Sequence, residues 1–297
     1  MLRKLKPLML PIAILGGMVF YRWMDKVTFL SPYLIFAMLV ITYCRIEPRE
    51  LKIGKFQIVL LLIQLLLSAA VYLSLAGFNN IVATGVFVCV FIPTATAAPV
   101  ITGMLGGSVS RLVTFSLISN LATAFLGPWI LAAIGDHPEM TFMESFSYIC
   151  GLVLPLLLFP IAIAFILRYT WRKAHTFLAT RQELSFYIWA LSLFIVVGGS
   201  VSFVINDYSP ETLQTMIWLA IGALAVCLLQ FGIGKWIGKR CGDKVAGGQG
   251  LGQKNTVLAI WLAMAYLNPL ASVAPAAYVA WQNIINSWEI YRHRRSQ

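Results

Sequence analysis

Residues 246–268 constrain the fold of this chain more than any other stretch. The stretch is long enough to cross a bilayer as a helix, which takes about 20 residues. Its first part, however, has glycines at positions 247, 248, 250 and 252, and the polar run Gln253-Lys254-Asn255-Thr256 precedes an apolar segment. Glycine loosens a helix, and unwound backbone at membrane depth is tolerated only where protein or a polar cavity surrounds it. We therefore expect a broken helix that lines a solute or ion site.

Lys254 is the most demanding residue of this stretch. A charge near the centre of a bilayer costs at least about 2.5–3.5 kcal/mol, so its side chain needs partners there. The alternative is that 246–256 is a cytoplasmic loop and that the span starts at Val257. That alternative leaves an apolar segment of about ten residues, ending at Tyr266, which is short for a span.

The whole chain has the composition of a polytopic helical membrane protein. Its 297 residues are 60% hydrophobic and only 11% charged, whereas soluble proteins are about 25% charged. In a soluble protein the net charge of +11 would suggest nucleic acid. Here the excess of basic residues in cytoplasmic loops of membrane proteins explains it better, so we expect a lipid bilayer as partner and no nucleic acid.

Apolar segments predict ten membrane spans with short connections, all within one transmembrane domain of the all-α class. The expected spans are 6–22, 28–44, 56–75, 80–105, 109–134, 145–168, 184–205, 212–234, 246–267 and 269–290. The first is expected to be a retained span, because no small-residue cleavage site follows its apolar run.

The charges on the connecting loops predict the orientation of the chain. Most lysines and arginines follow the second, sixth and eighth spans or lie in the carboxy-terminal tail. The loops after the fifth and seventh spans are acidic instead, with Asp136, Glu139, Asp207 and Glu211. This asymmetry predicts a protein of the cell (inner) membrane with both termini in the cytoplasm. Ten spans then divide into two repeats of five, about 1–140 and 141–297, and the odd number makes one repeat inverted.

The predicted fourth span is interrupted at a place that matches the break in the ninth. Pro93 and Pro99 each delete a helical hydrogen bond, and Thr94, Thr96 and Thr102 add hydroxyl groups. If two half-helices meet here, the amino-terminal end of one offers a positive dipole to an anionic group. The alternative is a proline kink whose freed groups are satisfied by neighbouring helices.

The predicted fifth span carries a polar stripe. Spacings of three and four place Ser116, Ser119, Asn120 and Thr123 on one face of the helix. Such a stripe either joins membrane helices or, if it faces the two broken spans, contributes to their site.

Several residue types are missing from the spans. All aspartates and glutamates fall in loops or near span ends, which argues against a carboxylate proton relay or a carboxylate-rich cation site. No HExxH motif, Walker loop or mid-span Ser/His pair is present. We expect neither an enzyme nor an ATP-driven pump, and no cofactor or firmly bound metal, although sodium or proton coupling stays open.

These motifs resemble the bile acid:sodium symporter family. The carboxy-terminal pattern is Gly252-x-x-Asn255-Thr256, then Asn268-Pro269-Leu270-Ala271, then Pro275, then Trp281-x-Asn283-x-x-x-Ser287; Gln64, Pro93, Thr96 and Pro128 also fit. The resemblance implies two inverted five-helix repeats and a panel domain that rocks against a core domain. Discontinuous spans 4 and 9 would cross in that core, where the substrate would meet Thr94, Thr96, Asn255 and Thr256.

The chain departs from the sodium-coupled members of that family. They carry Glu-x-Gly-x-Gln-Asn in the ninth span, where this chain has Gly250 in place of the glutamate and Lys254 in place of the glutamine. In the fourth span their Ser-Asn pair is replaced by Ala98 and Pro99. The alternative is an alignment shifted by one residue, in which Gln253 matches the family glutamine and sodium still binds.

From these departures we predict a secondary transporter of a small organic anion that does not need sodium. Lys254 would fill the vacated cation volume and donate to carbonyls of the fourth span and to Ser119, Asn120 or Thr123. It would serve as a fixed counter-ion, or carry a proton, because burial favours the neutral amine. The cation site or its replacement would comprise Gln64, Ser119, Asn120, Thr123, Gln253 and Lys254. The alternatives are a sodium-coupled symporter and a non-transporting receptor of the same fold.

Overall fold

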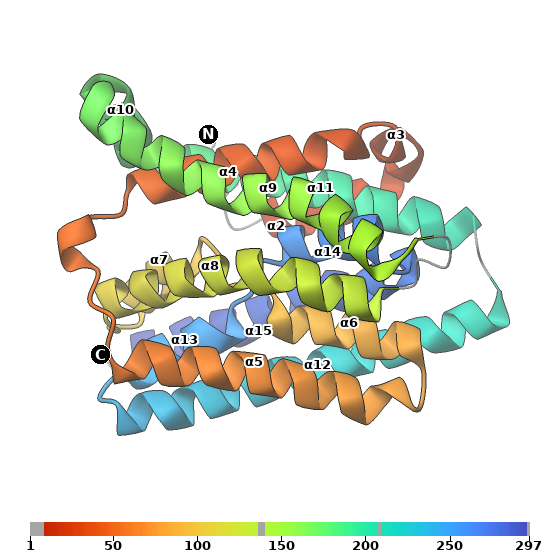
Figure 1. Ribbon diagram of the computed structural model, residues 1–297. Coiled ribbons are helices and arrows are strands. Elements are labelled where there is room, and N and C mark those ends of the chain that lie inside the picture. Colours follow the sequence, from red (N-terminus) through yellow and green to blue (C-terminus); the bar gives the residue numbers. More distant parts are fainter. Residues whose placement is uncertain (1–8, 136–139, 207–208, 296–297) are drawn as a thin grey trace.

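The computed structural model describes residues 9–135, 140–206 and 209–295 (Figure 1). The start of the predicted first span, and Asp136, Glu139 and Asp207, lie outside these residues. The described residues form α-helices and short 3-10 turns, as the all-α prediction requires.

The amino-terminal part of the chain contains two long helices and several shorter ones. They are α2 (Met9–Val19), α3 (Tyr21–Asp25), η2 (Thr28–Leu30), α4 (Ser31–Cys44), η3 (Pro48–Glu50), α5 (Lys55–Ala76), α6 (Asn80–Phe91), α7 (Ala98–Met104) and α8 (Val109–Ile134). The predicted fourth span is therefore two half-helices, α6 and α7. The backbone between them is not helical, so the simple proline kink is wrong.

The carboxy-terminal part also contains long helices and one broken helix. It contains α9 (Phe142–Thr170), α10 (Arg172–Thr180), α11 (Gln182–Asn206), α12 (Pro210–Arg240), α13 (Lys244–Gly252), α14 (Thr256–Tyr266), η4 (Pro269–Ser272) and α15 (Val273–Arg295). The predicted ninth span is α13 followed by α14. All residues from 246 to 252 are buried in α13, so the alternative of a cytoplasmic loop at 246–256 is wrong. The short helix α10 lies in a segment that we expected to be a loop.

Five of the described helices are long and apolar enough to cross a membrane, which makes this a multi-pass membrane protein. They are α5, α8, α9, α12 and the segment Glu183–Asn206 of α11. Shorter apolar helices lie at Thr28–Cys44, Asn80–Phe91 and Thr256–Tyr266. The last two are the half-helices on either side of the predicted site.

The helices gather in two groups that meet around α14. Figure 1 shows α2, α3, α4, α9 and α11 on one side, and α5, α6, α8, α12, α13 and α15 on the other. Helix α14 contributes Val257, Leu258, Ile260 and Leu262 to one large apolar cluster with residues of α4, α9 and α11. A second cluster joins α6, α12 and α15. The break between α13 and α14 is thus held inside the protein.

The glycines of α13 allow it to lie against α12 at very short range. A Cβ atom on Gly247 would lie 2.7 Å from Gly238 Cα, and one on Gly238 would lie 3.0 Å from Gly247 Cα. Gly234 meets Gly247 and Gly248 in the same way. These glycines are helical, so their role is close packing. The expected break lies after the last of them, because α13 ends at Gly252.

Candidate functional site: the crossing of the broken helices

The two breaks pair with each other as a short antiparallel ladder. Thr94 and Lys254 form an isolated antiparallel bridge. Ala95 N donates to Gln253 O at 2.8 Å, and Asn255 N donates to Pro93 O at 2.9 Å. Because these backbone groups have no helical partner at the break, pairing across the crossing satisfies them inside the protein.

Lys254 lies at the centre of the crossing with its side chain directed at the carboxyl end of α6. The residue is 1% exposed. Its Nζ donates to Val90 O at 2.8 Å and to Ile92 O at 3.0 Å. Two carbonyls satisfy both N–H groups of a neutral amine, whereas an ammonium has a third donor to offer. The expected contact with fourth-span carbonyls is present, and among the described residues no carboxylate pairs with Lys254.

Gln64 and Ser119 support the same carbonyls from α5 and α8. Gln64 Nε2 donates to Phe91 O at 2.7 Å and to Ile92 O at 3.3 Å. Ser119 Oγ donates to Gln64 Oε1 at 2.9 Å. Helix α6 ends at Phe91, so its last carbonyls receive no hydrogen bond from a following helical turn. The structure thus brings Gln64, Ser119 and Lys254 together, although Ser119 binds Gln64 rather than the lysine.

Asn120 and Thr123 lie buried on the same helix as Ser119 but do not contact Lys254. Asn120 Nδ2 donates to Ser116 O, one turn earlier, at 2.7 Å. Asn120 Oδ1 and Thr123 Oγ1 have no hydrogen-bond partner among the described residues. The expectation that either side chain accepts from Lys254 is therefore wrong, because backbone carbonyls of α6 take that place.

Gln253 points away from these groups. Its Oε1 accepts a short hydrogen bond from Asn286 Nδ2 of α15. Lys254, not Gln253, contacts the α6 carbonyls.

The four residues expected to contact a substrate surround the start of α14 and the first break. Thr94 Oγ1 is already bonded to Gly250 O at 2.8 Å, and Thr96 is half-buried. Asn255 Oδ1 caps α14 by accepting from Leu258 N at 3.3 Å. Asn255 Nδ2 and Thr256 Oγ1 are buried without a partner among the described residues. Unpaired donors at a helix amino terminus suit an anionic group.

Sequence reasoning missed a set of polar residues on α15 that contact α13 and the crossing. They are Tyr278, Gln282, Asn286 and Glu289. Their spacing of four, four and three was the available signal. The residues of α15 singled out instead face elsewhere: Asn283 Nδ2 bonds its own helix at Val279 O, and Ser287 is exposed.

Among the described residues no cluster of three or more His, Cys, Asp or Glu could hold a metal ion. The oxygen atoms at the crossing are carbonyls, amides and hydroxyls. Groups of this kind bind alkali cations or donate to and accept from polar ligands.

Comparison with known proteins adds one relative. No protein-family model matches the chain. The chain is 25% identical over 221 residues to the uncharacterized sodium-dependent transporter YocS of Bacillus subtilis (strain 168). The match covers 69% of this chain and 62% of that relative, so it spans less than two thirds of the relative's length. The fold thus defines a multi-pass helical membrane protein, and its sequence is similar to that of a membrane transporter.

Proposed function

We propose that the protein is a secondary transporter of a small organic anion that works by alternating access at the crossing. Ten membrane-spanning segments in two inverted repeats would support it, with α6–α7 and α13–α14 as the discontinuous spans. One observation carries the proposal: the buried Lys254 binds the carboxyl end of α6 and has no carboxylate partner among the described residues.

An anion is the ligand that this charge balance favours. A buried ammonium without a counter-ion is expensive at membrane depth. The amino terminus of α14 adds a partial positive charge, and Asn255 Nδ2 and Thr256 Oγ1 there lack partners among the described residues. A carboxylate bound at the crossing would accept from these groups and offset the charge of Lys254.

The contacts of the α6 carbonyls support the proposal of sodium independence. Ile92 O accepts from both Lys254 Nζ and Gln64 Nε2, so the cationic amine sits where a metal cation would be coordinated. A glutamate side chain at position 250, as in the sodium-coupled pattern, would also be hard to accommodate. A Cβ atom there would lie 3.1 Å from Phe115 Cδ1, so the ring would have to move to admit a larger side chain.

The geometry of the breaks supports the inverted repeat. The ladder between Thr94 and Lys254 is antiparallel, as a two-fold axis between the halves requires. Each break follows a half-helix that ends at the crossing and precedes one that starts there. This is the arrangement in which transporters hold solutes and ions near the membrane midplane.

Sodium-coupled anion transport is the second candidate. The relative YocS is described as sodium-dependent. Asn120 Oδ1 and Thr123 Oγ1 are buried oxygens without a partner among the described residues, and both are acceptors suited to a cation. Neither oxygen is one of the two acceptors of Lys254 Nζ, which are Val90 O and Ile92 O.

Thermal stability of the purified protein in detergent separates the two candidates. Sodium, potassium and choline chloride are compared at matched ionic strength from pH 5 to pH 9, for wild type and Lys254→Ala. A ligand that binds only the folded state raises Tm with concentration. We expect the same wild-type Tm in the three salts, and a pH response that disappears in the variant. Stabilisation by sodium alone would favour the second candidate.

Transport is then tested with carboxylates that raise Tm. A panel of small mono- and dicarboxylates is screened against wild type and Lys254→Ala, and those that stabilise only the wild type are assayed for uptake into proteoliposomes. We expect uptake that Lys254→Ala abolishes. Full uptake by the variant would remove Lys254 from the mechanism, and binding without uptake would indicate a receptor.

A further inference from the structure

Helix α15 presents a ladder of four polar side chains to α13 and the crossing. The positions 278, 282, 286 and 289 are four, four and three residues apart, which places them on one face of the helix. Tyr278 is 0% exposed, and Gln282 and Asn286 are each 3% exposed. We call Tyr278, Gln282, Asn286 and Glu289 the α15 ladder.

The first two members of the α15 ladder bind backbone next to Lys254. Tyr278 OH donates to Gly252 O at 2.8 Å. Gln282 Oε1 accepts from Lys254 N at 2.8 Å. One bond holds the backbone nitrogen that is bonded to the Cα of Lys254, and the other holds the carbonyl two residues earlier. Together they restrain the backbone from which the lysine side chain extends.

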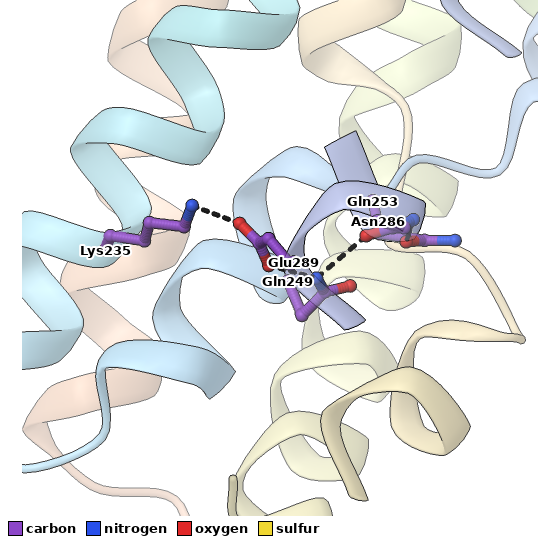
Figure 2. A network of polar contacts seen from close by, with 5 residues as sticks. All are labelled: Lys235, Gln249, Gln253, Asn286 and Glu289. Carbon is purple, nitrogen blue, oxygen red and sulfur yellow. Dashed lines mark hydrogen bonds and ion pairs between the residues drawn. The ribbon is translucent and has the colours of Figure 1, made fainter. Parts of the chain in front are cut away.

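The other two members bind side chains at the end of α13 and directly after it (Figure 2). Asn286 joins Gln249 and Gln253: its Oδ1 accepts from Gln249 Nε2 at 2.9 Å, and its Nδ2 donates to Gln253 Oε1. Glu289 Oε2 accepts from Gln249 Nε2 at 3.2 Å. Its other oxygen forms an ion pair with Lys235 of α12. The α15 ladder therefore runs from an ion pair to the backbone of the crossing.

Helix α13 depends on these contacts for its position. It has nine residues, four of them glycines, so it has few side chains of its own to pack. Each glycine also weakens a helix by about 0.5–1 kcal/mol relative to alanine. Its last turn must nevertheless hold Gln253 opposite Ala95, because Gln253 O accepts from Ala95 N at 2.8 Å.

We propose that Glu289, paired with Lys235, is a positioning residue that holds α13 and thereby aims Lys254 at α6. Glu289 is the least buried member of the α15 ladder: its side chain is 13% exposed, and that of its partner Lys235 is 28% exposed. It contacts no group of the crossing directly and acts through Gln249 and Asn286. Its consequence for transport rests on the proposed function, whereas its effect on the geometry of the crossing does not.

Hydrogen exchange of the full chain in detergent, followed by mass spectrometry, tests the proposal. Two sets of peptides are followed, one covering the first break (92–97) and one covering 249–256. The variants are Glu289→Lys, Lys235→Glu, the double swap and Lys235→Arg. Each single reversal places two like charges side by side where the ion pair was, which should open the crossing locally. We therefore expect exchange at least about tenfold faster in both peptide sets for Glu289→Lys and for Lys235→Glu. The double swap and Lys235→Arg should restore wild-type exchange.

The Glu47–Arg168 ion pair provides a matched control. It joins the loop after α4 to the end of α9 and does not contact the crossing. Glu47→Lys should leave exchange at the two breaks unchanged. Unchanged exchange at the breaks in Glu289→Lys, or equal acceleration in every peptide, would overturn the proposal. Should a reversed variant fail to fold, Glu289→Gln and Lys235→Met remove the charges singly and are held to the same standard.

Reactivity of Lys254 supplies a second measurement that loosened packing elsewhere would not change. A small amine-specific imidoester is applied to the folded protein, and modification of each lysine is measured by mass spectrometry. We expect Lys254 to react faster in Glu289→Lys and at the wild-type rate in the double swap. If the swap rescues exchange and reactivity while Lys254→Ala still transports, the proposed function fails and the positioning role stands. If Lys254→Ala abolishes transport while Glu289→Lys leaves exchange and reactivity unchanged, the positioning role fails and the proposed function stands.

Discussion

Thr94 and Lys254 are bridge partners across the crossing, and each side chain binds the carbonyl four residues before the other. Lys254 Nζ donates to Val90 O at 2.8 Å, and Thr94 Oγ1 donates to Gly250 O at 2.8 Å. These carbonyls belong to the last turns of α6 and α13, where a helix leaves acceptors unsatisfied. Each side chain thus replaces the amide that the next turn of the partner half-helix would have supplied.

The hydroxyl of Thr94 should therefore matter more than its methyl group. Thr94→Val keeps the shape of the side chain but leaves Gly250 O without its donor, and a buried unsatisfied group costs about 1–3 kcal/mol. We expect a lower Tm for Thr94→Val and a nearly normal Tm for Thr94→Ser, measured by thermal denaturation in detergent. Equal stability of the two variants would mean that the hydroxyl contributes nothing.

Replacing Lys254 by glutamine should create a response to sodium. Lys254→Gln removes the charge that binds Val90 O and Ile92 O, so those carbonyls become available to a cation. We expect the variant to be less stable than wild type in choline chloride and to regain part of the loss in sodium chloride. Lys254→Met is the control, since it cannot contribute an oxygen ligand and should regain less. A variant indifferent to sodium would show that the carbonyls alone do not form a cation site.

The broken helices could be predicted from local sequence, but their contacts could not. Pro93 and Pro99 mark one break, and the glycines with Lys254 mark the other. Which carbonyls Lys254 binds depends on how α6 and α13, far apart in sequence, cross in space. The close packing of the glycines was missed for the same reason: it becomes visible only when α12 lies against them. Ser119 was expected to contact Lys254, yet its hydroxyl donates to Gln64, because packing decides which of several acceptors a side chain reaches.

The close contact between α12 and α13 should make Gly247 intolerant of any side chain. A Cβ atom there would lie 2.7 Å from Gly238 Cα, and backbone cannot move aside as a flexible side chain can. We expect Gly247→Ala to cost about 1–3 kcal/mol, as overpacking does, and to lower Tm. Gly232 on α12 is the matched control, because nothing lies within 4 Å of a Cβ atom built there. Gly232→Ala should leave Tm unchanged or raise it slightly. Equal effects of the two variants would contradict the close-packing role.

The carboxyl group of Glu47, in the loop after α4, should make the stability of the folded protein depend on pH. Its carboxylate accepts from Arg168 Nη2 at 2.5 Å, and this hydrogen bond is the main cause that lowers the pKa of Glu47 from its ordinary value of 4.5. A carboxyl whose pKa is lower in the folded state stabilises the fold above its unfolded pKa, and the contribution is lost as pH falls through the folded pKa.

Thermal denaturation of wild type and Glu47→Gln between pH 7 and pH 3 measures this contribution. We expect wild type to have the higher Tm at pH 7, and the difference to shrink as pH falls below about 4.5. The effect should be small, because Glu47 is exposed and solvent and salt screen the pair. Raising the ionic strength should reduce the difference at pH 7 as well. A difference that persists unchanged at pH 3 would mean that glutamine disturbs the loop by a route other than the lost charge.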